Sequence, residues 1–165
     1  MTRIGLLSDT HGFLDDRIQE YFSRCDEIWH AGDVGNIETL ETLEGWKTVR
    51  AVSGNIDDHK LRAAVPEIQR FKCEKVDVLI KHIGGYPGRY DPSIYSTIVE
   101  NSPDLFISGH SHILKVMNDP KNKLLHINPG AAGKNGLHKV RTIVRFAIKG
   151  AKILELEVIE MEQRY

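Results

Sequence analysis

The sequence predicts a mixed α/β layer fold. Its first half alternates short apolar runs with helical patterns, the order typical of a parallel sheet covered by helices. Its last third is a succession of apolar runs separated by turn residues, which favours antiparallel strands. The 165 residues are long enough for one core, so we expect a single domain over 1–165.

Three strands and two helices are expected in the first 55 residues. The strands are placed at 3–9, 26–33 and 46–55, and the helices at 13–25 and 36–45. Apolar residues with helical spacing define the first helix: Phe13, Leu14, Ile18, Tyr21 and Phe22. In the second helix Asn36 is a candidate N-cap and Gly45 lies at the end.

One helix and six strands account for the rest of the chain. The strands are expected at 76–85, 103–112, 113–118, 123–130, 139–148 and 151–160. A glycine-rich loop, "GGYPGRYD" (84–91), precedes the helix at 91–102, where Asp91 is a candidate N-cap and Pro92 the first helical residue. The stretch Asp119–Asn122 and the pair Lys149 and Gly150 supply turns between the closing strands.

Composition excludes several classes of protein. Hydrophobic residues make up 41% and charged residues 27%, as in ordinary globular chains, and the formal net charge is −1. That balance gives no support to stable binding of nucleic acid or of an anionic membrane. No run approaches the roughly 18 apolar residues of a membrane span, and the N-terminus lacks a secretory pattern. Cys25 and Cys73 are expected to be free, buried thiols, so we expect a cytoplasmic protein.

Polar residues with metal-binding chemistry follow the expected strands. They are Asp9, His11, Asp33, Asn55, His82, His110 and His112. In open α/β sheets the ligand crevice lies at the carboxyl ends of the strands, so these distant residues can converge. Imidazole, carboxylate and amide groups together suit divalent transition metals. Seven donors exceed the four of a structural zinc and favour a two-metal site, with ions about 3.5–4 Å apart and one bridging carboxylate. Gly12, Gly32, Gly54 and Gly109 remove side chains beside these donors.

The order of these motifs resembles that of the calcineurin-like metallophosphoesterases. The matching stretches are "DTH" (9–11), "GD" (32–33), "GNID" (54–57), His82 and "GHSH" (109–112). The short length and "INPG" (127–130) are similar to the small bacterial and archaeal YfcE-type phosphodiesterases. The resemblance runs from residue 3 to about residue 133. It implies a metallo-dependent phosphatase-like fold, a four-layer α/β/β/α sandwich with two mixed sheets.

The resemblance also implies roles for the seven donors. One metal would be held by Asp9, His11 and His112, the other by Asn55, His82 and His110, and Asp33 would bridge the two. Asn55, Asp33 and His110 are the expected catalytic residues. Two divalent ions are expected, with manganese the first choice and iron, zinc or nickel as alternatives.

The implied reaction is hydrolysis of phosphoric esters. A hydroxide bridging the two metals would attack phosphorus, with small phosphodiesters as first substrates and monoesters as the alternative. A homo-oligomer is compatible with the resemblance. A non-catalytic protein-binding scaffold with the same fold is the alternative function, and purely structural metals are a third hypothesis. The complete donor set favours the enzyme.

The chain departs from the family at two positions. Many members place a histidine directly after the metal-binding asparagine, where it protonates the leaving group, but this chain has Ile56. Water, or a side chain such as His59, would then be the acid, or esters with good leaving groups would be preferred. Ile83 follows His82 where relatives continue with glycine, so the loop is expected to leave the sheet differently.

Other residues have predicted supporting roles. Asp57 is expected to orient a neighbouring group, and His126 either to orient a ligand or to be a satisfied core histidine. Arg89 is a candidate for binding a substrate phosphate, and Tyr86 or Tyr90 for stacking on an aryl group or base. His30 is expected to pack beneath the site and His138 to lie at the surface. Asn128 and Gly130 are expected in a turn that supports the metal-binding loops.

Overall fold

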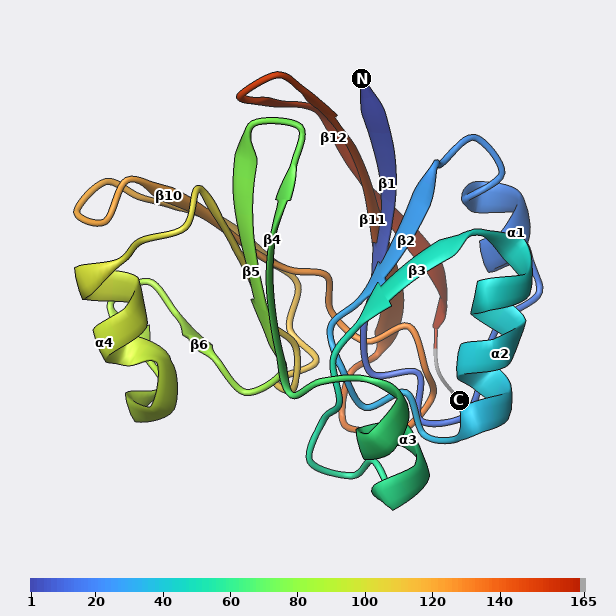
Figure 1. Ribbon diagram of the computed structural model, residues 1–165. Coiled ribbons are helices and arrows are strands. Elements are labelled where there is room, and N and C mark those ends of the chain that lie inside the picture. Colours follow the sequence, from blue (N-terminus) through green and yellow to red (C-terminus); the bar gives the residue numbers. More distant parts are fainter. Residues whose placement is uncertain (164–165) are drawn as a thin grey trace.

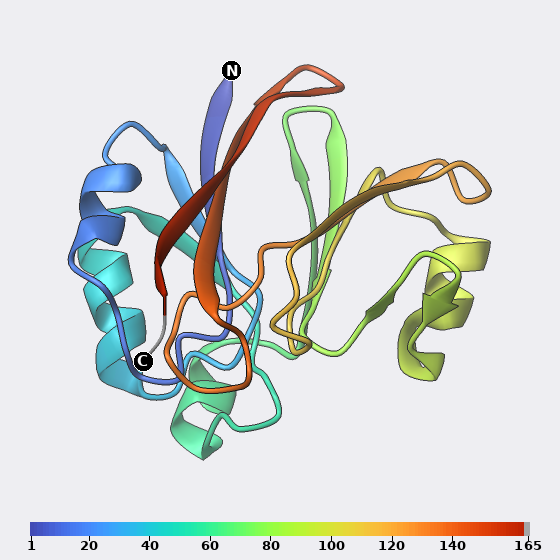
Figure 2. The ribbon, with the colours of Figure 1, turned by 180° about the vertical axis from the view of Figure 1, so that it is seen from behind.

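The computed structural model describes residues 1–163, and its first sheet contains both chain ends of that range (Figure 1). This sheet has the strand order β12–β11–β1–β2–β3. Its strands are β1 (Thr2–Leu7), β2 (Glu27–His30), β3 (Thr48–Ala51), β11 (Val140–Lys149) and β12 (Lys152–Gln163). The first three run parallel, whereas β11 is antiparallel to both of its neighbours. Seen from behind, the long β11–β12 hairpin lies beside the N-terminal strand (Figure 2).

The second sheet packs against the first and has the order β4–β5–β8–β10–β9. Its strands are β4 (Ile68–Cys73), β5 (Val76–Lys81), β8 (Leu105–Ile107), β9 (Lys115–Asp119) and β10 (Leu124–Asn128). The three central strands are parallel, and β4 and β9 are antiparallel edges. The glycine-rich loop forms a small hairpin of β6 (Gly85–Tyr86) and β7 (Arg89–Tyr90). Both large sheets are therefore mixed, as predicted.

Helices cover the outer faces of the two sheets. On one side lie α1 (Arg17–Tyr21) and α2 (Ile37–Trp46), and on the other lies α4 (Pro92–Glu100) (Figure 1). The short α3 (His59–Ala64) follows β3 near the carboxyl ends of the parallel strands. The layer order is α/β/β/α, so the predicted fold is confirmed.

The core explains why the strands are apolar on both faces. Leu6 and Trp29 face the second sheet, while their neighbours Leu7 and Ile28 face the helices, and all four are fully buried. Strands covered on both sides must be apolar at successive positions. Burying each such side chain contributes about 1.5–3 kcal/mol. Ile94 of α4 closes the opposite outer layer.

Capping predictions are confirmed for two helices. The side chain of Asn36 accepts a hydrogen bond from the Thr39 amide at 2.8 Å, which starts α2. Asp91 accepts from the Ser93 amide at 2.9 Å, and Pro92 is the first residue of α4. Cys25 and Cys73 are buried and unpaired, as expected. None of the helices within residues 1–163 combines the length and apolar character needed to cross a bilayer.

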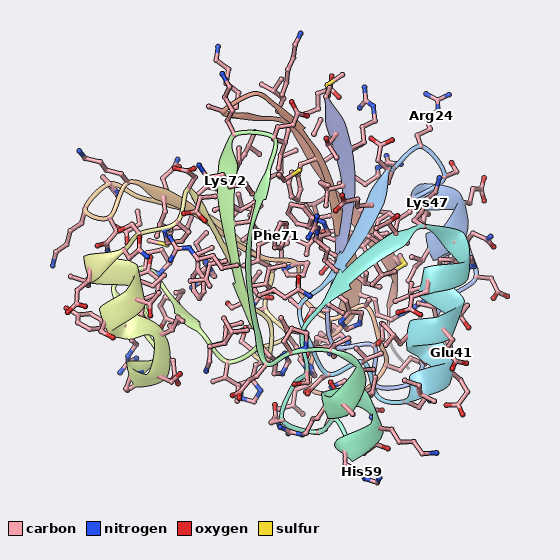
Figure 3. All side chains as sticks on the ribbon, viewed as in Figure 1. Arg24, Glu41, Lys47, His59, Phe71 and Lys72 are labelled. Carbon is pink, nitrogen blue, oxygen red and sulfur yellow. The ribbon has the colours of Figure 1, made fainter. Side chains whose placement is uncertain are left out.

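Several predicted elements were wrong. The helix expected over 13–25 is only the five-residue α1, because the Asp15 side chain bonds the Arg17 amide and holds the preceding residues in a loop. The second helix continues one residue past Gly45, to Trp46. Helix α3 and strand β4 were not predicted. In β4, Phe71 points toward the first sheet (Figure 3), where its ring centroid lies 5.0 Å from that of Trp29.

Candidate metal centre

The carboxyl ends of parallel strands from both sheets meet at one edge of the sandwich. Asp9 and His11 follow β1, and Asp33 follows β2. His82 comes directly after β5 in the second sheet, and His110 and His112 follow β8. The structure gathers the donor atoms of these six residues into two groups of three.

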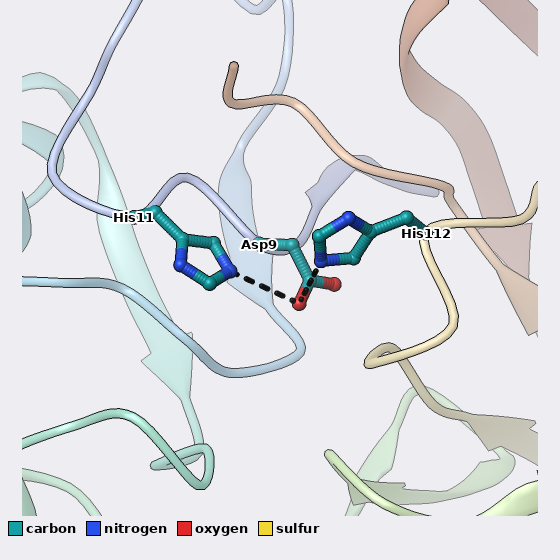
Figure 4. Close-up of side chains that lie close together, drawn as sticks. All are labelled: Asp9, His11 and His112. Carbon is teal, nitrogen blue, oxygen red and sulfur yellow. Dashed lines mark ion pairs between the residues drawn. The ribbon is translucent and has the colours of Figure 1, made fainter. Parts of the chain in front are cut away.

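The first group contains Asp9, His11 and His112, with donor atoms within 4.8 Å of one another (Figure 4). Oδ1 of Asp9 lies 3.2 Å from Nε2 of His112 and 3.7 Å from Nε2 of His11. The Asp9 side chain is fully buried, and the two histidine side chains are 14% and 16% exposed. The group is thus open to solvent only on the histidine side.

The second group contains Asp33, His82 and His110, again with donor atoms within 4.8 Å of one another. Oδ2 of Asp33 lies 3.1 Å from Nε2 of His82. The same oxygen lies 3.5 Å from Nε2 of His11 in the first group. Asp33 is therefore the member of the second group that also lies close to the first.

Asn55 lies beside the second group. It is exposed and lines a cavity of about 140 Å³ together with His82 and Lys81. The amide of the next residue, Ile56, donates a 3.1 Å hydrogen bond to Oδ1 of Asp33. The loop after β3 is thereby tied to Asp33, and the role of the Asn55 amide as a ligand stays a prediction.

Five of the six gathered residues have left-handed backbone conformations. The φ angles are 55° at Asp9, 47° at His11, 55° at Asp33, 72° at His110 and 62° at His112. For residues other than glycine this conformation costs on the order of 1 kcal/mol or more each, and such strain clusters at functional sites. The surrounding fold holds these side chains in an arrangement that the backbone alone would not choose.

Neighbouring glycines leave the space that the donors need. A Cβ at Gly54 would lie 2.0 Å from Oδ1 of Asp33, and one at Gly109 would lie 2.2 Å from Oγ of Ser8. At Gly32 it would lie 2.6 Å from the ring of His82. The prediction that these glycines make room beside the donors is confirmed for all three positions. Gly12 instead faces Asn36.

Hydrogen bonds direct free lone pairs into the centre. Oγ of Ser8 and the amide of His110 both donate to Oδ2 of Asp9, at 2.6 and 3.1 Å. Nδ1 of His82 donates to the Ala31 carbonyl at 2.7 Å, so in the neutral ring Nε2 carries a lone pair. Ser8 was not singled out in the sequence, although its place directly before Asp9 was a signal.

Three buried donor atoms of the centre have no hydrogen-bond partner among residues 1–163: Oδ1 of Asp9, Nε2 of His11 and Nε2 of His82. Leaving a buried polar atom unpaired costs about 1–3 kcal/mol. Carboxylate oxygens and imidazole nitrogens converging in this way are the ligands that divalent transition metals take. The residues present therefore fit a pair of metal ions.

The charges of the centre also favour cations. Burial opposes ionisation of Asp9, but the adjacent imidazoles of His11 and His112 outweigh it and lower the pKa of this carboxyl. Burial likewise opposes ionisation of Asp33, and His82 lowers its pKa. Both carboxyls are thus ionised at neutral pH. The adjacent carboxylate of Asp9 in turn raises the pKa of His11.

Buried polar residues support the loops that carry the donors. Asp57 accepts from the amides of Val34, Gly35 and Gly54 at 3.2, 2.9 and 2.8 Å, and so joins the loops after β2 and β3. Nδ2 of Asn128 donates to the Gly109 carbonyl at 3.0 Å.

Two further histidines lie close to the centre. His30 is buried beside Oγ1 of Thr10 at 3.0 Å, as expected beneath the site, and burial lowers its pKa to about 4. His138 was expected at the surface, which is wrong. It is half-buried, with its ring 5.1 Å from that of His112 and perpendicular to it, because the loop 133–139 folds back over the centre.

Four of the remaining predicted residues lie around a cavity of about 460 Å³ that reaches His110. Tyr86, Arg89, Tyr90 and His126 all line it. The hydroxyl of Tyr90 donates a 2.7 Å hydrogen bond to Asp119, which fixes the Tyr90 side chain in the cavity wall. His59 is exposed at the start of α3 and points away from the fold (Figure 3).

Comparison with known sequences decides the family. A sequence model of the calcineurin-like phosphoesterase superfamily domain matches residues 2–151. The chain belongs to this superfamily. A probable metallophosphoesterase of Methanothermobacter thermautotrophicus is 31% identical to this phosphoesterase domain over 137 residues, covering 78% of this chain and 76% of the relative. One of Methanocaldococcus jannaschii is 33% identical over 136 residues, covering 78% and 67%. The resemblance drawn from the motifs is confirmed.

Solved structures share the phosphoesterase fold. An archaeal phosphodiesterase superposes with a TM-score of 0.78 at 21% identity, covering 96% of this chain and 99% of that one. Vps29 of Chaetomium thermophilum superposes with a TM-score of 0.77 at 13% identity over the full length of both chains. At these identities the likeness establishes the architecture alone.

Proposed function

We propose that this phosphoesterase domain hydrolyses phosphoric esters, phosphodiesters first, with two divalent metal ions. The observation that carries the proposal is the pair of adjacent donor groups that meet at Asp33. Buried donor atoms of both groups have no hydrogen-bond partner among the described residues. A structural site for one ion would need only one of the two groups.

Each metal would take the ligands that its group provides. Asp9, His11 and His112 would hold one ion, His82 and His110 the other together with Asn55, and Asp33 would bridge them. When bound, the two ions would acidify water and offset the negative charge of the phosphate. Manganese is the first choice, because mixed nitrogen and oxygen donors discriminate weakly among divalent metals and availability decides.

The protein's own groups would position the substrate. The side-chain NH₂ of Asn55 can donate to a phosphate oxygen while its carbonyl oxygen faces a metal. Asp57 holds the loops of Asp33 and Asn55 in register through its three accepted hydrogen bonds. Arg89, exposed at the cavity and without an ion pair among the described residues, offers a bidentate contact to the phosphate.

Protonation of the leaving group limits the substrates. Ile56 is 46% exposed at the position where a histidine acid would stand, and His59 points away from the centre (Figure 3). Neither can donate a proton to a departing alkoxide. We therefore expect esters with good leaving groups to react fastest.

The decisive experiment measures hydrolysis of bis-p-nitrophenyl phosphate by metal-stripped protein, with and without added Mn²⁺. We expect manganese-dependent turnover in the wild type and its loss in His112→Ala. His59→Ala is the matched control, since it removes an exposed histidine outside the centre. Folded protein that shows no turnover with any divalent metal would contradict the proposal and make the non-catalytic scaffold the better account.

A further inference from the structure

A second binding feature adjoins the metal centre. The cavity of about 460 Å³ lies between the β6–β7 hairpin and the segment 109–115, and reaches His126 and Asn128 of β10. Its volume is within the range of small-molecule sites, about 300–1,000 Å³. Because His110 belongs both to this cavity and to the second donor group, a molecule in the cavity would be next to the metals.

His126 lines this cavity and carries an unpaired acceptor. The residue is 1% exposed, and its Nδ1 lies 3.0 Å from the Phe106 carbonyl. A carbonyl only accepts, so Nδ1 carries the proton, and Nε2 of the neutral ring is a bare lone pair. Nε2 is buried and has no hydrogen-bond partner in the part of the chain that the structure describes. Burial lowers the pKa of His126 to about 4, so the ring is neutral at physiological pH.

The walls around His126 are mostly apolar and firmly held. Tyr90 is anchored by its hydroxyl bond to Asp119, and its ring packs edge-on against Phe106 at 5.7 Å. Ile83, Pro92 and Ile113 add apolar surface. Such walls suit a flat ring. A hydrogen-bond donor on that ring would pair with the acceptor of His126.

Positive charge gathers at the exposed side of the cavity. Arg89 is exposed there, and Nζ of Lys115 lies 3.6 Å from the ring centroid of Tyr86. The acidic group of the lining, Asp91, is occupied by hydrogen bonds from Ser93. A ligand with an anionic end and a flat, donor-bearing end therefore matches the cavity.

We propose that the cavity binds the nucleobase of a nucleoside phosphoester, with a base N–H donating to Nε2 of His126. The inference rests on the proposed function, since it places the substrate's phosphate at the metals and its organic group in the cavity. A buried acceptor discriminates strongly against a ligand that leaves it unpaired. His126 is thereby a specificity-determining residue.

The test in turnover compares two esters on the wild-type protein. Thymidine 5′-(p-nitrophenyl phosphate) has a base N3–H, and its N3-methyl derivative does not. We expect N3-methylation to lower kcat/KM about tenfold, the effect of one hydrogen bond of about 1.4 kcal/mol. In His126→Asn the amide NH₂ can replace Nδ1 toward Phe106 while the Nε2 acceptor is gone, so methylation should have no further effect. Equal rates for the two esters in the wild type would overturn the inference.

Binding without turnover separates this inference from the proposed function. We would titrate thymidine 5′-monophosphate into metal-free protein and follow the ¹⁵N resonance of His126 Nε2. A shift toward the hydrogen-bonded range is expected, even if the protein hydrolyses no ester at all. An unshifted resonance at saturating nucleotide would overturn the cavity assignment, whatever the turnover of bis-p-nitrophenyl phosphate.

Discussion

Nε2 of His11 lies 3.5 Å from Oδ2 of Asp33, although the two side chains belong to different donor groups. The same oxygen is 3.1 Å from Nε2 of His82. A carboxylate close to both sets of ligands could bridge two metal ions, as proposed above. Changes that move Asp33 should therefore disturb both of the proposed metal sites.

Gly54→Ala should disable the centre without removing any donor. The new Cβ would lie 2.0 Å from Oδ1 of Asp33 and must displace that carboxylate. A misplacement of about 1 Å can cost about 100-fold in rate, so we expect at least that loss in kcat at saturating Mn²⁺. The control is Gly45→Ala in α2, where a Cβ meets nothing within 4 Å. It should keep full activity and stabilise the protein by about 0.5–1 kcal/mol. Full activity in Gly54→Ala would refute the proposed role of Asp33.

Asp57→Asn should weaken both folding and metal binding. The carboxylate accepts three backbone hydrogen bonds, and an amide oxygen is a poorer acceptor for them. We expect the free energy of unfolding to fall by about 1–3 kcal/mol, and Mn²⁺ affinity to fall about 10–100-fold. Urea unfolding and metal titration measure the two effects. Asp58→Asn is the control, because Asp58 only caps α3 and asparagine caps equally well. Similar losses of stability and of Mn²⁺ affinity in both variants would show that the three hydrogen bonds of Asp57 do not support the metal centre.

Local patterns in the sequence predict the donors and a mixed α/β fold, whereas the four-layer arrangement was implied by the resemblance to the family. Apolar runs followed by Asp9, Asp33 or His110 indicate where buried strands end. The side chains of these three residues can bind metals in any fold, so their chemistry is recognisable from the sequence. Helix α3 was missed because it buries only Leu61 among its six residues. Asp58, which caps it, was the available signal.

Other features depend on contacts that no local pattern encodes. Strand β4 mixes polar and apolar residues. Its place in the sheet depends on Phe71 packing against Trp29 and on Arg50 lying over the Phe71 ring. The unpaired acceptor of His126 depends on a carbonyl 20 residues away in the chain. His138 reaches His112 only because the loop 133–139 folds back over the centre.

The ion pair between Asp15 and the buried Arg141 makes the free energy of unfolding depend on pH. Nη2 of Arg141 lies 2.8 Å from Oδ2 of Asp15, and the Arg141 side chain is 4% exposed. Hydrogen bonding by Arg17 first, and by Arg141 as well, holds the pKa of Asp15 below its ordinary value of 3.8. A carboxyl whose pKa is lowered by folding stabilises the protein above the unfolded pKa, and this stability is lost as pH falls.

Asp15→Asn should therefore destabilise the metal-free protein by about 2 kcal/mol at pH 7, less than the roughly 3–5 kcal/mol of a fully buried pair. The difference from wild type should shrink as the pH falls below about 4, because the Asp15 carboxyl of the unfolded chain then takes up a proton while that of the folded protein stays ionised. Urea unfolding at several pH values measures this. Asp16→Asn is the control, since Asp16 is exposed and its side chain makes no capping bond. A difference that stays constant with pH would show that the ionised pair contributes nothing.

Electron paramagnetic resonance during titration with Mn²⁺ would show whether Asp33 joins two metal ions. We expect two ions to bind per chain and the wild type to give the multiline spectrum of an exchange-coupled pair. That coupled spectrum should be lost in Asp33→Asn. A single bound ion, or two ions with uncoupled spectra in the wild type, would contradict this expectation.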